Sequence, residues 1–283
     1  MKQKIRKKWK NTARFRFWLF VCLAAVLVVI SLLSPALMPN DPYETNVLMA
    51  KAGPCAEYPL GTDALGRCVL SRVLAGSRTS IFCSVLLVAI MFVFGTGVGV
   101  IAGYKGGVLD MVLMRITDFM LSFPQMVVAI VVAGILGGSL LNAMIALGVT
   151  GWTGFARVAR SRVIAMKKED YVTAAIISGN GPIRMMTDYV LPNIIGPLII
   201  YAAIQIGTTM LNLAGLSFLG LGVQVPQAEW GSMVNEGRAM IQLAPQVVFA
   251  PAAAIFITVV VFNLLGDAAR DLADRGSLQE GGQ

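Results

Sequence analysis

Residues 80–103 read SIFCSVLLVAIMFVFGTGVGVIAG and contain no charged side chain. A helix needs about 20 such residues to cross the hydrocarbon core of a bilayer. The chain as a whole is 57% hydrophobic and 13% charged, whereas soluble domains carry about 25% charged residues. The sequence therefore predicts an all-α, polytopic membrane protein. Including 80–103, we expect six spans, and the other five are the apolar runs 17–33, 119–137, 140–155, 194–213 and 247–266.

The 23 Lys and Arg residues are unevenly distributed around these spans. With both termini in the cytoplasm, 18 of them fall on the inner side and 5 on the outer side, as the excess of basic residues in cytoplasmic loops requires. We therefore expect a multi-pass protein of the cell (inner or plasma) membrane with both termini cytoplasmic. The net charge of +8 then reflects orientation and membrane lipid, with no nucleic-acid partner.

The basic segment 1–16 and the run 17–33 allow a second interpretation, a cleaved secretory signal peptide. The run is long for a signal peptide, and Pro35 would crowd a cleavage site near Ala36. We therefore interpret 17–33 as a retained first span.

The residue types that carry chemistry are scarce. The chain has no histidine, the usual general base and a common metal ligand. No lysine follows a glycine, so there is no phosphate-binding loop of the GxxxxGK[ST] type. No span contains the paired carboxylates of a proton relay. We expect no catalytic residue, no metal site and no cofactor, and a transporter of this composition must obtain its energy from a partner protein.

Four cysteines occur without a CxxC pair, which argues against a zinc site. Cys22 and Cys83 lie in apolar runs, where cysteine acts as a small hydrophobe. Cys55 and Cys68 share one outer loop. They are either two free thiols, which we favour, or a disulfide if that loop faces an oxidising compartment.

An inner segment, 169–193, reads EDYVTAAIISGNGPIRMMTDYVLPN. A break near Gly179 and Pro182 would divide it into two short helices, and Pro192 suits the first turn of the next span. Its spacing resembles the EAA-x3-G-x9-I-x-LP loop of ATP-binding-cassette importer permeases, although Thr173 stands in place of the Glu and Tyr189 in place of the Ile. The alternative is an ordinary amphipathic cytoplasmic loop.

Three further stretches resemble a particular branch of that family. GTDALGRCVLSRVLAGSRTS (61–80), AGLSFLGLGVQVPQAEWG (214–231) and VFNLLGDAARD (261–271) are similar to segments of dipeptide, oligopeptide and nickel importer permeases. Cys68 replaces the Asp that is usual in the first stretch. The resemblance extends from the first span to Asp271 and identifies the chain as the second permease of such a system, which has a long loop after its first span.

The resemblance implies the partners and the coupling residues. A second permease would form a heterodimer with this chain, two ATP-binding subunits would bind below and hydrolyse ATP, and an extracytoplasmic substrate-binding protein would deliver cargo. The ATPase-coupling residues that it implies are Thr173, Ala174, Ala175, Gly179, Leu191 and Pro192.

Two other groups of residues are candidates for the transport path. Gln205, Thr208, Thr209 and Asn212 follow i, i+3, i+4, i+7 spacing, which places them on one helical face. Polar side chains avoid lipid, so this face either lines the path or makes interhelical hydrogen bonds. In the outer segment 214–246, Phe218, Glu229 and Trp230 form a candidate gate, and a loop that merely caps the span ends is the alternative.

The predicted organisation has four parts: a basic cytoplasmic N-terminus (1–16), the first span with its outer loop (17–79), a five-span permease core with the coupling loop (80–271, loop 165–193) and a cytoplasmic tail (272–283). The function expected is ATP-driven import of peptides or of nickel or other metal chelates by alternating access. Without histidine or clustered ligands in its spans, the chain is poorly equipped to hold bare Ni²⁺. A secondary transporter or channel, or a membrane anchor, would need no ATPase partner.

Overall fold

The computed structural model describes residues 2–181 and 184–280, and their regular structure is helical apart from one isolated β-bridge between Thr62 and Cys68. The all-α prediction is thus confirmed for the described residues. The helices are α1 (Lys2–Leu37), α2 (Val69–Lys105), α3 (Gly107–Leu121), α4 (Gln125–Leu136), α5 (Leu140–Met166), α6 (Asp170–Ile177), α8 (Leu191–Phe218), α9 (Trp230–Gly237) and α10 (Gln246–Glu280), with short turns of helix at Val47–Met49, Met185–Val190 and Arg238–Met240.

Four helices among the described residues are long and apolar enough to cross a membrane, and a fifth span results if α3 and α4 are counted together. The four belong to α1, α2, α8 and α10. The remaining run expected to span, 140–155, forms the first part of α5. The second part of α5 carries Arg157, Arg160 and Arg162. Six spans remain consistent with the structure, although α5 is less apolar than the others.

The third span differs from the single helix expected over 119–137. It is divided into α3 and α4, which are bent by 84° at residues 122–124. Pro124 causes the break, because proline lacks an N–H and disfavours helical geometry at the preceding residue. On its inner side α3 is joined to α5 by ion pairs, Asp110 with Arg160 (2.6 Å) and Asp118 with Arg157 (2.7 Å).

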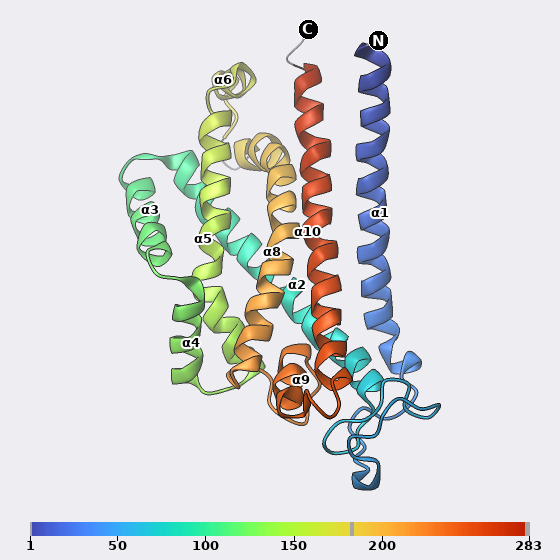
Figure 1. Cartoon of the computed structure of the whole chain (residues 1–283). Coiled ribbons are helices and arrows are strands. Elements are labelled where there is room, and N and C mark those ends of the chain that lie inside the picture. The colour runs from blue at the N-terminus through green and yellow to red at the C-terminus, as the bar shows by residue number, and fades with distance from the viewer. Residues whose placement is uncertain (1, 182–183, 281–283) are drawn as a thin grey trace.

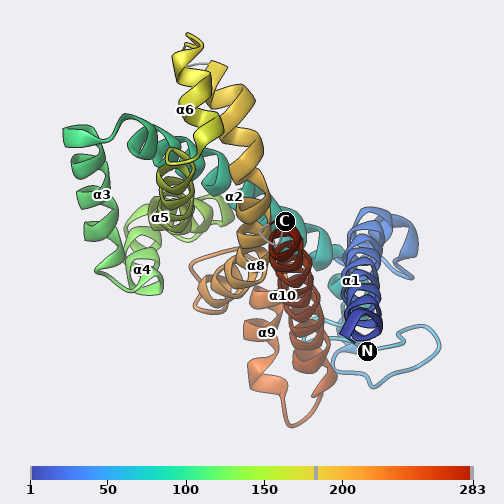
Figure 2. The same cartoon turned by 90° about the horizontal axis from the view of Figure 1, so that it is seen from above.

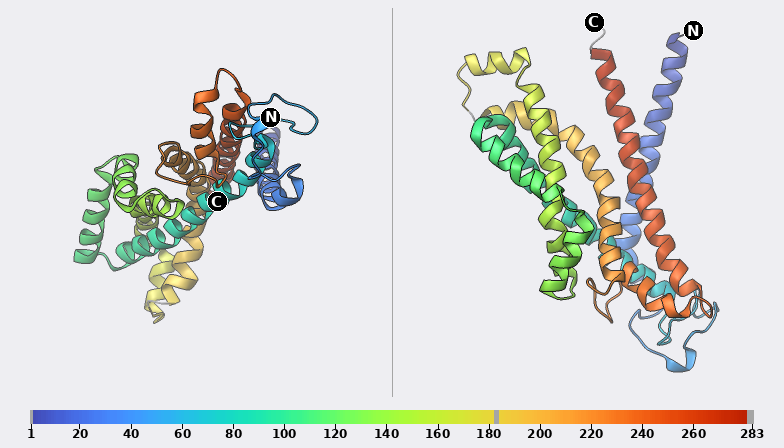
Figure 3. Two further views of the ribbon diagram at one scale, coloured as in Figure 1. Left: turned by 90° about the horizontal axis from the view of Figure 1, so that it is seen from below. Right: turned by 60° about the vertical axis from the view of Figure 1, so that its left-hand side comes forward.

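Different elements lie at the two ends of the molecule. Both termini and α6 lie at one end, whereas α9 and the loop between α1 and α2 lie at the other (Figure 1). α2 crosses obliquely behind the other long helices. Seen from above, α3 and α4 lie on one side of the bundle and α1 on the opposite side (Figure 2). In the side view α1 and α10 diverge toward the end that carries the termini (Figure 3).

The packing of α2 against α5 forms the centre of the fold. A side chain at Gly99 would place its Cβ 2.3 Å from the carbonyl oxygen of Ala156, and one at Gly95 would lie 2.3 Å from that of Trp152. Only glycine allows the two backbones to approach this closely. The row of Gly95, Gly99 and Gly103 therefore serves helix packing, as small residues at four-residue spacing commonly do.

Candidate translocation path and coupling loop

The inner segment forms a short helix followed by a tight turn. α6 ends at Ile177, and Gly179 has φ of +79°, a left-handed conformation that favours glycine. The Asn180 side chain donates a hydrogen bond to the carbonyl of Ala175 at 3.0 Å, which satisfies one of the free carbonyls at the helix end. The break near Gly179 is confirmed, and the expected break at Pro182 lies outside the described residues.

The residues expected to couple the chain to an ATPase do not all face outward. Thr173 and Ala174 are exposed on α6, whereas Ala175 is buried at 6% exposure and packs in the main core. Ile177, which the sequence did not single out, is 81% exposed at the end of the helix. No local pattern in 170–177 marks Ile177, because its exposure depends on how α6 packs.

The second half of this segment continues directly into a span. A single π-helical turn, Met185–Val190, joins α8 without a gap. Leu191 is exposed, and Pro192 occupies the first turn of α8, as the sequence predicted. α6 thus projects beyond α5 at the end of the molecule that holds both termini (Figure 1).

The polar face of α8 is partly exposed. Thr208 is exposed, Gln205 and Asn212 are half-buried, and Thr209 is buried. Within the described chain, none of these four side chains makes a hydrogen bond to another helix. Interhelical hydrogen bonding of this face is therefore not seen among the described residues, and the lining role stays a prediction.

The candidate gate residues are anchored in the fold. Glu229 and Trp230 are each 3% exposed. Glu229 caps α9 by accepting hydrogen bonds from the backbone N–H groups of Gly231 (2.9 Å) and Ser232 (2.8 Å). The Trp230 indole donates to the carbonyl of Val73 on α2 at 2.9 Å. Burial raises the pKa of the Glu229 carboxyl despite these hydrogen bonds. Phe218 is 38% exposed at the end of α8.

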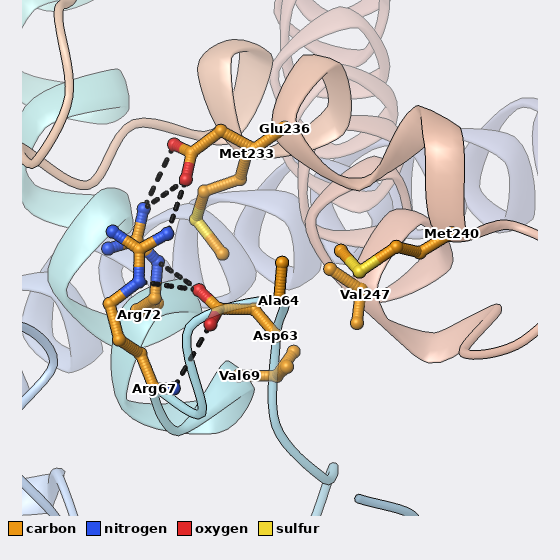
Figure 4. A pocket seen from close by; sticks show the side chains of 9 residues that line it. All are labelled: Asp63, Ala64, Arg67, Val69, Arg72, Met233, Glu236, Met240 and Val247. Atoms are coloured by element: carbon orange, nitrogen blue, oxygen red, sulfur yellow. Dashed lines mark hydrogen bonds and ion pairs between the residues drawn. The ribbon is translucent and has the colours of Figure 1, made fainter. Parts of the chain in front are cut away.

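Beside this anchor lies a buried charge cluster to which the sequence analysis assigned no role: Asp63, Arg67, Arg72 and Glu236 (Figure 4). Arg67 pairs with Asp63 at 2.6 Å, and Arg72 pairs with Glu236 at 3.1 Å. Arg67 also pairs with Glu236. The cluster joins the outer loop and α2 to α9, and its charges balance.

The cavity beside the cluster measures ≈ 30 Å³, about the volume of one water. It is too small for cargo, so the cluster fastens the outer loops together. Asp63, Arg67 and Arg72 all belong to the stretch 61–80 that resembles the importer permeases, and an acid and a base four residues apart was the signal present in the sequence. Their partner Glu236 lies more than 160 residues away, where no local pattern indicates it.

In the described part of the chain, the outer-loop thiols Cys55 and Cys68 are free. Cys55 is exposed and Cys68 is buried. The structure thus has the two free thiols that we favoured.

Comparisons with known proteins place these features in a family. Residues 95–278 match the family described as binding-protein-dependent transport system inner membrane component. A dipeptide transport system permease protein of Alkalihalophilus pseudofirmus is 40% identical, over 87% of this chain and 81% of its own length. A nickel transport system permease protein of Escherichia coli is 37% identical over 93% and 95%, and a glutathione transport system permease protein of Pectobacterium atrosepticum is 35% identical over 95% and 92%.

Among solved structures, the inward-facing methionine ABC transporter MetNI contains a chain with a TM-score of 0.59 and 18% identity, covering 72% of this chain and 97% of that one. This likeness supports the fold. The match over 95–278 and the relatives above 30% identity establish the family and favour an ATP-driven importer over a secondary transporter or channel. The chain belongs to the binding-protein-dependent transport system inner membrane components, and it is a membrane permease of this importer class.

Proposed function

We propose that this chain is one of two permeases in an importer that carries peptides or metal chelates through the membrane by alternating access. A second permease completes the path as a heterodimer, two ATP-binding subunits dock at α6 and hydrolyse ATP, and a binding protein delivers cargo at the opposite end. The named relatives that transport dipeptide, nickel and glutathione support this cargo class.

The observation that carries the proposal is that part of the expected coupling loop and the polar face of α8 belong to one continuous helix. The second part of the expected coupling loop, Met185–Val190, continues into α8 without a gap, and α8 bears the polar face. Movement of this loop by an ATPase would therefore be transmitted through Met185–Val190 to Gln205, Thr208 and Asn212. Both termini and α6 are assigned to the cytoplasm by the distribution of basic residues.

The outer end combines an exposed aromatic side chain with a loop that buried contacts hold in place. Glu229 and Trp230 hold the loop between α8 and α9 against α2, and Phe218 projects from the end of α8. We propose that Phe218 closes the outer mouth while Glu229 and Trp230 keep the loop in place. Phe218→Ala should then raise ATP hydrolysis in the absence of cargo, whereas an unchanged basal rate would contradict the gate.

The test of the whole proposal is reconstitution of the complex that co-purifies with the tagged chain. We expect a second permease, two ATP-binding subunits and ATP-dependent uptake in proteoliposomes when the loaded binding protein is present. The chain purified alone and moving solute without ATP would overturn the proposal.

Two variants test the roles proposed for α6 and for the polar face of α8. Ile177→Asp should lose the co-purifying ATPase, because a charge would be placed on the exposed tip of α6. Leu48→Asp, at a residue 96% exposed at the opposite end, is the matched control and should keep it. Replacing both Gln205 and Asn212 by Leu should reduce uptake while the ATPase stays bound; unchanged uptake and substrate range would remove the lining role.

A further inference from the structure

A second cavity lies between the inner halves of three long helices. It measures ≈ 250 Å³ and is lined by parts of α5, α8 and α10. Small-molecule sites begin at about 300 Å³, so this cavity has nearly the size required to hold a small cargo. Its charged residues are Arg162 of α5 and Arg270 of α10, and α8 contributes Tyr201 and Ile204.

The two arginines differ from their neighbours in having no acidic partner. Arg157 and Arg160 of α5 are paired with Asp118 and Asp110. In the part of the chain that the structure describes, neither Arg162 nor Arg270 forms an ion pair.

Two acidic side chains near Arg270 on α10 are described, and neither forms an ion pair with it. Asp271 pairs with Arg16 of α1 at 3.6 Å. Asp267 does not line the cavity. The cavity therefore presents two guanidinium groups, whose planar sets of N–H donors match a carboxylate.

The cavity is continuous with the proposed transport path. Tyr201 lines it, and Tyr201, Gln205, Thr208 and Asn212 stand at i, i+4, i+7 and i+11 along α8. This spacing keeps all four on one side of a helix. The polar stripe thus leads from the outer half of α8 into the cavity with the two arginines.

We infer that this cavity is the inner end of the translocation path, and that Arg162 and Arg270 favour cargo with a free carboxylate over an uncomplexed divalent cation. Such cargo is either a peptide, through its C-terminal carboxylate, or a metal chelate whose ligands include carboxylates. Aquated Ni²⁺ would meet two positive charges there, and no acidic side chain is among the described residues that line the cavity. This inference rests on the proposed importer function and narrows its cargo.

The first test measures the cavity itself and needs no transport. In the purified nucleotide-free complex, with the four native cysteines replaced, Ala273→Cys places a thiol in the cavity. We expect an anionic methanethiosulfonate reagent to modify this thiol several-fold faster, relative to a cationic one, than when Arg162→Gln and Arg270→Gln are also present. Equal ratios with and without the two arginines would overturn the inference even if the importer functions as proposed.

The second test compares three probes in proteoliposomes: a dipeptide with a free carboxylate, the nickel–citrate chelate and aquated Ni²⁺. The probe that the wild-type complex imports with ATP identifies the source of the carboxylate. The Arg162→Gln, Arg270→Gln double variant should lower that uptake by roughly tenfold, while cargo-loaded binding protein still stimulates ATP hydrolysis. Arg115→Gln, which removes an exposed charge of α3 that lines none of the cavities described here, is the matched control.

Three further outcomes distinguish a failure of the carboxylate preference from a failure of the proposed importer function. ATP-driven uptake of aquated Ni²⁺ without a chelator would overturn the carboxylate preference and leave the importer function intact. Absence of any ATP-dependent uptake would instead contradict the proposed function. An anionic phospholipid that co-purifies with wild type but not with the double variant, with uptake unchanged, would assign the arginines to a lipid headgroup and overturn the inference.

Discussion

At the outer end, two buried arginines stabilise the packing of the loops through ion pairs. The side chains of Arg67 and Arg72 are 3% and 2% exposed, a position that charged residues occupy only when they are paired. Arg72 also donates to the carbonyl of Pro226 at 3.3 Å, so one side chain connects two loops and α9. The network thus connects outer loops that contain little regular structure.

Glu236→Ala should therefore destabilise the protein by about 3 kcal/mol, because it leaves two arginines facing one carboxylate. The measurement is thermal unfolding of the purified protein in detergent. Glu44→Gln, at an exposed position of the same outer region, is the control and should leave the midpoint unchanged. Equal midpoints for the two variants would show that the buried pairs contribute nothing.

The raised pKa of the Glu229 carboxyl predicts that the stability of the protein depends on pH. Because burial raises the pKa of its carboxyl above 4.5, the folded protein binds this proton more tightly than the unfolded chain does. Its contribution is then fully present below pH 4.5 and is lost as the pH rises toward the folded pKa. Glu229→Gln should flatten this part of the profile of unfolding midpoint against pH. A variant with the wild-type slope would refute the assignment.

At the scale of elements, the position of α2 against α5 decides where the path can run. Glycine at 95, 99 and 103 lets the backbones approach, and Phe155, Ala156 and Ala159 fill the interface at 0% exposure. α8 packs against both helices and leaves its polar face uncovered. A wider α2–α5 spacing would displace α8 and with it the cavity at its inner end.

Gly99→Ala should cost about 1–3 kcal/mol of stability, since its Cβ would lie 2.3 Å from a backbone oxygen and the helices must separate. Gly97→Ala on the same helix meets no atom within 4 Å and should be neutral or slightly stabilising. Protein yield and unfolding midpoint in detergent measure both. Similar losses for the two variants would show that the close contact between α2 and α5 is not the cause, because helix propensity favours alanine over glycine at both positions.

For the whole molecule, orientation and function are linked. α6 can reach an ATPase only if it lies in the cytoplasm with the termini, and the outer loops can receive cargo only from the other side (Figures 1 and 3). The excess of basic residues near the termini and α6 favours this arrangement.

Cysteine labelling tests the orientation directly. Cys55 is exposed in the outer loop, and Cys68 is buried. A membrane-impermeant maleimide should label Cys55 in spheroplasts, whereas Ser178→Cys in a Cys55→Ser background should react only after the membrane is opened. The reverse pattern would invert the topology and place α6 away from any cytoplasmic ATPase.

The sequence by itself determined the fold class, most of the apolar helices and the break at Gly179, because long uncharged runs and Gly and Pro breaks depend on interactions within a few residues. It placed Pro192 in the first turn of α8 and the break at Gly179. It did not locate the bend between α3 and α4, although Pro124 was visible, because an apolar run of sufficient length masked the break.

Only the tertiary structure decided which of the candidate side chains are open and which are buried. Ala175, Glu229 and Trp230 belong to the packed interior, whereas Ile177 and Thr208 remain exposed. The tertiary structure also brings Glu236 next to Arg72, and it places Arg162 of α5 and Arg270 of α10 in the lining of one cavity. Such pairings connect residues more than a hundred positions apart. They depend on how helices pack, which no local pattern of residues specifies.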